Sequence, residues 1–244
     1  MKYLEVTPHP ILSNYVDAYW TATGSSTRRS IEKILPDGCV DIIFNLGNDC
    51  YTDNGNFLMK SEKAFLVGTM TKYKETVMDN NTSLLGIRFK PGAVSAFFRF
   101  ALLSEITNQT IELERLASFD LSKLLDSPFD LLNQELVRKL NKPNLYILEQ
   151  IQTIKKSKGQ IKVEELASIH CTTVRLLERT FKENLGITPK EFVNLVRYQN
   201  ATKAIERRKS HESMLSIALD FGYYDHSHLT NDFKRYTGSA PTSI

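Results

Sequence analysis

A repeated block near the C-terminus is the feature that most constrains the fold of this chain. Residues 181–189 read FKENLGITP and residues 233–241 read FKRYTGSAP, so Phe-Lys, Gly and Pro recur at the same internal spacing, 52 residues apart. Upstream, the pair LA at 166–167 corresponds to IA at 217–218, an offset of 51 residues, so one residue is inserted in the second copy. Two copies of one local pattern predict two copies of one structural unit.

Each copy has the pattern of a helix-turn-helix. VEELASI and MLSIALDF read as short amphipathic helices, and TTVRLLERTFKENLG and DHSHLTNDFKRYTG read as longer helices that follow a tight turn. Gly222 stands at the second turn, where a positive φ costs little, whereas Cys171 stands at the first. Each longer helix ends at a Gly that suits a left-handed cap and is followed by a Pro that prevents continuation.

The segment between the copies predicts a long connecting helix. After Pro189 the chain has no Gly or Pro up to residue 210, and its apolar residues recur at helical spacing. A rigid connector would fix the separation of the two longer helices. If both enter successive major grooves on one face of a DNA duplex, that separation must be about 34 Å.

The longer helices also predict an exposed polar face. Leu177, Phe181, Leu229 and Phe233 fall on the side that faces the core of each unit. The remaining positions are rich in hydrogen-bond donors, and Arg can pair with guanine, Asn with adenine, and Lys with phosphate. A solvated helix face is the alternative for either copy alone.

Residues 150–241 resemble the double helix-turn-helix DNA-binding domain of the AraC/XylS family of bacterial transcription regulators. The resemblance rests on LLERTFKENLGITPKEFVNLVRYQNATKAI and SIALDFGYYDHSHLTNDFKRYTGSAP. It departs from the family pattern at Cys171, where Gly is usual, at His170, where an apolar residue is usual, and at Asn231, where Arg is common. Together, the helix faces and the resemblance predict DNA contacts at Thr173, Arg175, Leu176, Glu178, Arg179, Lys182, His226, Ser227, His228, Asn231, Lys234 and Arg235.

The first half of the chain reads as strands followed by helices. After the turn signal PDG at 36–38, CVDIIFNLG alternates Val40, Ile42 and Phe44 with Asp41, Ile43 and Asn45, which is the period of a strand. The Asn-Gly pair at 54–55 marks a hairpin turn, and AFLVGTM and SLLGIRF read as further strands.

From the KPG at 90–92 the apolar period becomes helical. We expect helices in AVSAFFRFALL, within TIELERLASF, and over residues 128–140 and 144–156. The expected architecture is an α+β N-terminal domain, a small antiparallel sheet or barrel plus helices, over residues 1–143. An all-α DNA-binding domain of two helix-turn-helix units joined by a long helix follows over residues 144–244. The apolar stripes of these predicted helices have two possible roles: they pack within the chain, or they form a homodimer interface.

The N-terminal domain carries candidates for effector binding. LPDGCVDIIFNLG and GIRFKPGAVSAFF are similar to an uncharacterised sensor-like domain that precedes this DNA-binding domain in many bacterial regulators. That resemblance implies a regulatory role without an effector. Aromatic residues and charges within apolar strands make Trp20, Asp41, Phe44 and Arg88 the candidate effector contacts, and a place in the core is the alternative for the aromatic ones.

The distribution of charge and the cysteine content limit which partners and which sites the chain is expected to have. The net charge is +3, with 16 basic against 17 acidic residues up to residue 144 and 15 against 11 after it, so the basic excess lies in the repeat-bearing half. The three cysteines form no CxxC pair, which argues against a disulfide framework and a structural zinc site. No secretory signal or apolar stretch of about 18 residues is present, so we expect a cytoplasmic protein with no membrane partner.

Two rival functions are weaker. A metal sensor would use Asp225, His226 and His228, but histidines two residues apart do not share a helix face. For an enzyme, His9, Asp37, Cys39 and Asp41 could suggest a nucleophile with a base, but nothing in the chain resembles a nucleophile elbow or a phosphate loop. The sequence therefore predicts a non-enzymatic transcription regulator, without cofactor or metal, that binds double-stranded DNA. RNA polymerase, a small-molecule effector and a second copy of the chain stay open as partners.

Overall fold

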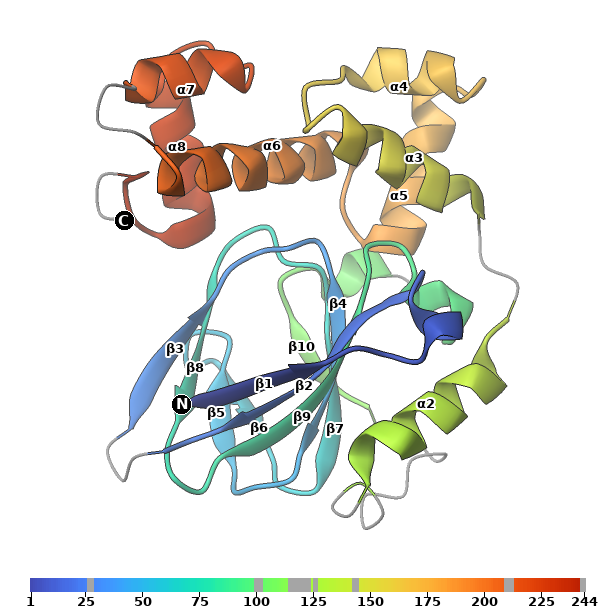
Figure 1. The fold of residues 1–244 in the computed structure, drawn as a ribbon, viewed down its shortest axis with the longest axis vertical. Coiled ribbons are helices and arrows are strands. Elements are labelled where there is room, and N and C mark those ends of the chain that lie inside the picture. Colours follow the sequence, from blue (N-terminus) through green and yellow to red (C-terminus); the bar gives the residue numbers. More distant parts are fainter. Residues whose placement is uncertain are drawn as a thin grey trace.

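A computed structural model of the chain describes residues 1–25, 29–98, 103–113, 124, 127–141, 145–208 and 213–241. A sheet-rich N-terminal part is followed by a helical C-terminal part, which confirms the predicted fold class (Figure 1). The larger sheet has six antiparallel strands in the order β1-β2-β9-β4-β7-β10, and two-stranded ribbons pair β3 with β8 and β5 with β6. The strands are β1 (Lys2–Val6), β2 (Val16–Thr23), β3 (Ser30–Ile34), β4 (Val40–Asn45), β5 (Cys50–Thr52), β6 (Phe57–Met59), β7 (Lys63–Val67), β8 (Lys74–Met78), β9 (Ser83–Phe89) and β10 (Thr110–Glu112).

The two faces of the larger sheet have different surroundings. Val40, Ile42 and Phe44 of β4 belong to the main core, where α2 (Pro128–Lys139) covers the sheet. Ile43 points to the opposite face, into a smaller cluster that includes Trp20. The predicted alternation along β4 is confirmed, and the second face is enclosed by the β3–β8 and β5–β6 ribbons.

Two of the predicted N-terminal helices are wrong where the structure describes them. Residues 94–96 and 103–106 form only short 3-10 turns, η2 (Val94–Ala96) and η3 (Leu103–Ile106), and residues 99–102 lie outside the described part. Residues 110–112 form β10, which pairs with β7, while residues 114–119 again lie outside it. At residues 110–112 pairing with β7 overrides an apolar spacing that local pattern alone cannot assign. The helices predicted over 128–140 and 144–156 are confirmed as α2 and α3 (Leu145–Lys156).

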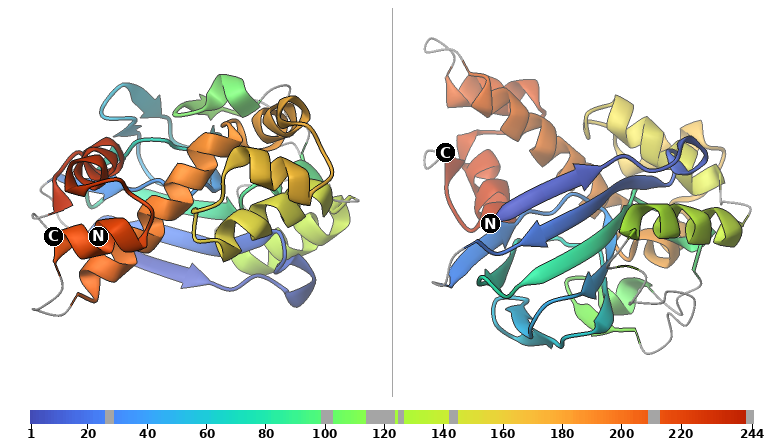
Figure 2. Two further views of the ribbon diagram at one scale, coloured as in Figure 1. Left: turned by 90° about the horizontal axis from the view of Figure 1, so that it is seen from above. Right: turned by 60° about the horizontal axis from the view of Figure 1, so that its bottom comes forward.

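The C-terminal part contains two helix-turn-helix units. The first comprises α4 (Val163–Ile169) and α5 (Val174–Leu185), and the second α7 (Met214–Asp220) and α8 (His226–Thr237). The long α6 (Pro189–Glu206) joins them, as predicted. Seen from above, α6 crosses the strands of the sheet domain with one unit at each end (Figure 2).

One helix serves two cores. Phe192, Val193 and Val196 of α6 pack with α3, α4 and α5, whereas Leu195 and Tyr198 pack with α7 and α8. Because both ends of α6 are buried against different units, the units are held at a fixed separation. An 18-residue helix is about 27 Å long.

The core clusters also bear on the domain boundary. Leu132 and Leu136 of α2 belong to the core of the sheet domain, whereas Ile147 and Ile151 of α3 belong to the core of the first helix-turn-helix unit. This packing supports a boundary between α2 and α3, and we propose it there, in agreement with the predicted division after residue 143.

Local backbone geometry follows the turn and cap predictions. Gly222 has φ +72°, and Gly186 and Gly238 end α5 and α8 in the left-handed region. Cys171 occupies the first turn with φ +48°, a conformation that costs a residue with a Cβ roughly 1 kcal/mol. The first turn is therefore formed at a cost that glycine avoids in the second.

Candidate nucleic-acid interface

Helix α5 presents a polar face away from its core. Thr173 caps the helix, with its Oγ1 accepting a hydrogen bond from the backbone N–H of Leu176 at 3.2 Å. Leu177 and Phe181 are fully buried. On the other side the exposed residues recur at the i, i+3, i+4 and i+7 spacing of one helix face. They are Arg175, Glu178, Arg179 and Lys182.

Helix α8 repeats this arrangement. The carboxylate of Asp225 caps it by accepting from the backbone N–H of His228 at 2.7 Å. Leu229 and Phe233 are fully buried against α6 and α7. The positions that correspond to the polar face of α5 are Ser227, Thr230, Asn231 and Lys234, of which all but the partly buried Thr230 are exposed.

Several predicted contact residues already have partners within the chain. Thr173 uses its hydroxyl as a helix cap, and the ring of His228 lies edge-on to Tyr223 with centroids 5.1 Å apart. The guanidinium of Arg235 points to Glu191 of α6, with Nη2 3.8 Å from the carboxylate. Thr173 thus helps to fix the start of α5, and His228 and Arg235 hold α8 in place, which fits a positioning role for these side chains better than base contact.

One exposed side chain just before α8 was not predicted from the sequence. Tyr224 is 87% exposed, although it is an aromatic residue beside the turn. Its neighbour Tyr223 is buried in the second helix-turn-helix core. The doubled Tyr after Gly222 is the only sequence signal for it, and nothing in that pair tells which ring faces out.

Helices α5 and α8 both end against the sheet domain. Thr107, which follows η3, donates a hydrogen bond from Oγ1 to the carbonyl oxygen of Gly186 at 2.7 Å. Gly238 lies against the ring of Tyr73, so close that a Cβ there would fall 2.6 Å from Cε1. The opposite ends, together with α4 and α7, lie on the side away from the sheet domain (Figure 1).

The sheet domain contains a cavity that brings together three of the four effector candidates. Trp20, Asp41 and Arg88 line a space of about 350 Å³ between the larger sheet and the β3–β8 ribbon. Phe44 is fully buried in the main core on the other face of the sheet and does not line the cavity. Ligand sites commonly measure roughly 300–1,000 Å³, so the space suits a small molecule.

The carboxyl of Asp41 lies at the charged end of this cavity. Its Oδ1 accepts a hydrogen bond from Trp20 Nε1 at 2.7 Å and lies 3.5 Å from Nε of Arg88, the residue opposite it in the β4–β9 register. Burial raises the pKa of Asp41 to about 7, and the charge of Arg88 opposes that rise. Burying a carboxylate without a partner costs free energy. Arg88 is only a partial partner for Asp41, because its guanidinium also lies close to Asp37 and Glu5.

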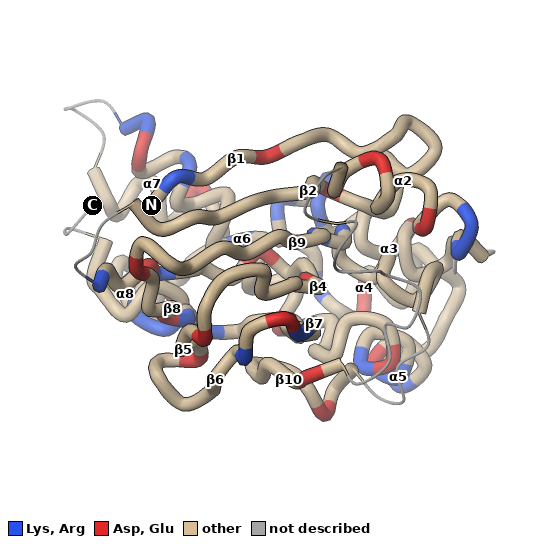
Figure 3. Tube along the Cα trace, turned by 90° about the horizontal axis from the view of Figure 1, so that it is seen from below, with Lys and Arg blue, Asp and Glu red and all other residues tan. Residues whose placement is uncertain are grey.

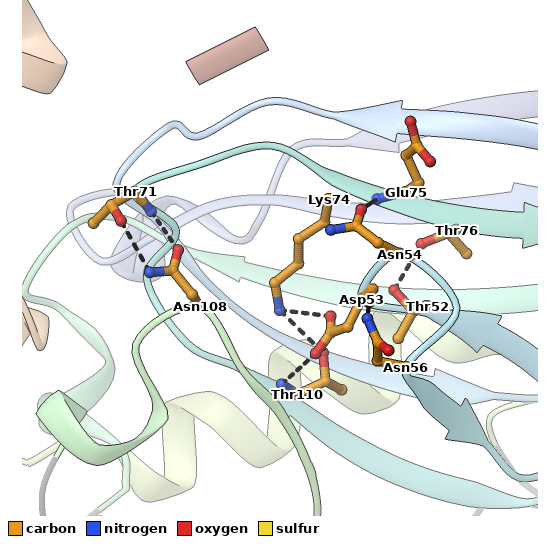
Figure 4. Close-up of polar contacts among 10 residues, drawn as sticks. All are labelled: Thr52, Asp53, Asn54, Asn56, Thr71, Lys74, Glu75, Thr76, Asn108 and Thr110. Atoms are coloured by element: carbon orange, nitrogen blue, oxygen red, sulfur yellow. Dashed lines mark hydrogen bonds and ion pairs between the residues drawn. The ribbon is translucent and has the colours of Figure 1, made fainter. Parts of the chain in front are cut away.

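A second buried charge was not anticipated from the sequence. The side chain of Lys74 is 4% exposed, and its Nζ lies 2.7 Å from Asp53 Oδ1 and 3.2 Å from Thr110 Oγ1 (Figure 4). Burial lowers the pKa of Lys74, although the bond to Asp53 opposes this. Thr110 closes the group by donating its N–H and its hydroxyl to the Asp53 carboxylate. The pair joins the β5–β6 turn to β8 and β10.

Charge is mixed over the sheet domain, where Lys and Arg are interspersed with Asp and Glu (Figure 3). The basic excess after residue 144 is therefore the only charge asymmetry at the level of domains. Within the described ranges, no three His, Cys, Asp or Glu side chains gather as metal ligands would. In the same part of the chain no helix is apolar enough over a sufficient length to cross a membrane.

Two exposed helix faces, carried by paired helix-turn-helix units on one rigid connector, define a DNA-binding module attached to a sheet domain. Residues 166–244 match the family model described as a helix-turn-helix domain, and residues 4–112 match one described as a domain of unknown function, DUF6597. Residues 166–244 are thus similar to a helix-turn-helix domain, in agreement with the two units that the structure shows there.

The relatives agree with this assignment. An uncharacterized HTH-type transcriptional regulator from Haemophilus influenzae is 30% identical over 105 residues, which cover 43% of this chain and 33% of that protein. The HTH-type transcriptional activator RhaS from Klebsiella pneumoniae is 33% identical over 81 residues, covering 33% of this chain and 28% of that protein. The chain thus spans about a third of the length of these relatives. A solved structure of ToxT from Vibrio cholerae aligns over 91% of this chain and 94% of its own, with a TM-score of 0.47 and 12% identity.

Proposed function

We propose that the chain is a sequence-specific DNA-binding transcription regulator that reads two successive major grooves and is gated by its sheet domain. The observation that carries the proposal is the pair of matching exposed faces on α5 and α8, held apart by α6. Arg175 and Arg179 supply the guanine-type contacts of the first unit, and Asn231 supplies the adenine-type contact of the second. Lys182 and Lys234, one turn further along each helix, reach phosphate.

Gating follows from the contacts between the two domains. The loop before β4 packs on α6, where a Cβ on Gly38 would fall 2.9 Å from Phe192. Gln199 of α6 donates to the carbonyl oxygen of Pro36 at 3.3 Å. Because the sheet domain touches α6 and the ends of both reading helices, a change in its shape alters how the two helices are presented.

The proposal has consequences for partners and location. A regulator of this kind acts in the cytoplasm of a bacterium, where the chromosome lies. Contact with RNA polymerase and pairing of two copies are partners that this role allows. We propose no catalytic step for the chain, in keeping with relatives that are transcriptional regulators.

Selection of bound sequences from a random duplex pool by the full-length chain, at fixed salt, tests the proposal. Two enriched boxes about one helical turn apart are expected. A single box would mean that one unit does not read bases, and the unit with Cys171 and His170 is the first to suspect. No enrichment, with or without a ligand of the cavity, would contradict the proposed function.

A further inference from the structure

The cavity of the sheet domain has an aromatic wall beside a carboxylate. The rings of Tyr3 and Trp20 lie with centroids 6.1 Å apart, and Trp20 donates to Asp41 from the same wall. Met59, Met70 and Met78 also line the space, and their flexible thioether side chains adapt to ligands of different shape. The lining is therefore mainly apolar and adaptable. Asp37, Asp41 and Arg88 form one charged end of it, and its other charged residues are Glu32, Lys33 and Lys74.

That charged end has an excess of negative groups. The guanidinium of Arg88 is shared among three carboxylates: Nη1 lies 3.1 Å from Glu5, and Nε lies 3.5 Å from both Asp37 and Asp41. Nε of Arg88 makes no hydrogen bond of good geometry although it is buried. In the part of the chain that the structure describes, no donor reaches Oδ2 of Asp41. A further cation would complete this group, whereas an anion would be repelled by it.

We infer that the cavity binds a small, mainly apolar molecule with one basic nitrogen, whose ammonium pairs with Asp41 while its apolar part lies against Tyr3 and Trp20. Cations bind well over the faces of Trp and Tyr, and a charge-assisted hydrogen bond adds to that attraction. Asp37 of the β3–β4 loop also lines the cavity, Glu5 of β1 pairs with Arg88, and the charge of Asp17 of β2 acts on Asp41.

The cavity is connected to the second reading helix through β3. Lys33 lines the cavity, yet its Nζ donates to the carbonyl oxygen of Thr237, the last residue of α8, at 3.1 Å. The same Nζ lies 4.6 Å above the centre of the Tyr73 ring, on which Gly238 packs. An occupant that moves β3 therefore moves a contact of α8. Only this last step rests on the proposed function, because binding to the cavity does not require DNA.

Calorimetric titration of the full chain without DNA tests the assignment. The probes are 2-phenylethylamine, its neutral isostere 2-phenylethanol, and phenylacetate as the acid. We expect the amine to bind at least about tenfold more tightly than the alcohol, the effect of one charge-assisted contact. Asp41→Asn keeps the shape of the side chain and should remove this preference while leaving the affinity for 2-phenylethanol unchanged. Glu62→Gln, an exposed carboxylate on the loop before β7, is the control and should change neither affinity.

The outcomes separate this inference from the proposed function. Equal affinity for amine and alcohol, preference for phenylacetate, or no binding of the amine would each overturn the assigned ligand class. Loss of alcohol binding in Asp41→Asn would overturn the role given to its charge. If the amine binds and leaves the affinity for the selected duplex unchanged, the site stands and the gating of the regulator is wrong.

Discussion

The ammonium of Lys33 lies 3.1 Å from the carbonyl oxygen of Thr237, and this hydrogen bond joins a strand of the sheet domain to the last residue of the second reading helix. The carbonyls at the end of a helix lack partners within it, and cations stabilise that end through the helix dipole. Lys33 is thus a favourable cap for α8 that comes from the other domain. A movement of β3 would therefore shift this cap at the C-terminal end of α8.

Lys33→Met keeps the apolar stem of the side chain and removes the charge, so it tests this cap. We expect weaker discrimination at the second DNA box, by about 0.5–1 kcal/mol, with the first box unchanged. Binding to duplexes that carry mutations in one box at a time measures the effect. Lys63→Met removes a lysine from β7, far from α8, and is the control; an equal loss at both boxes would contradict a local role for Lys33.

Arg179 tests base reading by the first unit. Its side chain is 69% exposed and pairs only loosely with Glu183 at 3.8 Å, so it is free to turn toward a base. Arg179→Ala is expected to cost about 1–3 kcal/mol of binding free energy and to relax specificity at one base position. Arg138→Ala removes an equally exposed Arg with an i, i+3 partner on α2 and should change nothing. Uniform weakening on every sequence would make Arg179 a phosphate contact instead.

Gly186 tests the contact between α5 and the sheet domain. It has φ +79°, and a Cβ there would lie 2.6 Å from the carbonyl oxygen of Leu103. Gly186→Ala therefore combines left-handed strain with a clash against backbone. Gly55→Ala shares the strain, at φ +83°, but its Cβ would meet no atom within 4 Å. We expect a free energy of unfolding lowered by about 1 kcal/mol for Gly55→Ala and clearly more for Gly186→Ala, measured by urea titration. Equal losses of unfolding free energy in the two variants would mean that η3 moves away from the added methyl group at little cost.

The helical part of this fold was predictable because its determinants are local. Turn residues, left-handed glycine caps and apolar spacing of period 3.6 all lie within short segments, so α5, α6 and α8 could be located from the sequence. The strand β10 could not, because its three residues are strand only through pairing with β7. Likewise β3 has mostly exposed residues and gives no alternating apolar signal.

Only some of the residues that line the cavity could be predicted, because the cavity too depends on how the strands pair. Charged residues within apolar strands drew attention to Asp41 and Arg88, but their opposition across β4 and β9 depends on strand register. Phe44 and Asp41 lie on the same strand but point to opposite faces of the sheet. No local signal in the sequence tells which of the two faces borders the cavity. Lys74 lies in a polar segment, TKYKETV, that reads as a surface loop until β8 and β10 enclose it.

The buried pair of Lys74 and Asp53 predicts a non-additive effect on stability. Lys74→Met leaves the Asp53 carboxylate buried without its partner, which should lower the free energy of unfolding by about 3–5 kcal/mol. Adding Asp53→Asn removes the orphaned charge, and much of the loss should return. The exposed pair of Lys63 and Glu112 is the control, where the corresponding single and double variants should differ by about 0–1 kcal/mol. Additive losses at the buried pair would show that water reaches it.

Asp41 predicts a pH dependence of stability whose sign can be stated. Because burial raises the pKa of Asp41 from 3.8 to about 7, the folded chain holds this proton more firmly than the unfolded chain. The stabilisation of the folded chain by this bound proton is fully present below about pH 4 and is lost as the pH rises through about 7. Asp41→Asn cannot ionise, so relative to the wild type it should gain stability between about pH 4 and 7.5 and stay constant above that range. Urea titrations of both proteins across this range measure the difference. A difference that is independent of pH would mean that Arg88 compensates the carboxylate fully.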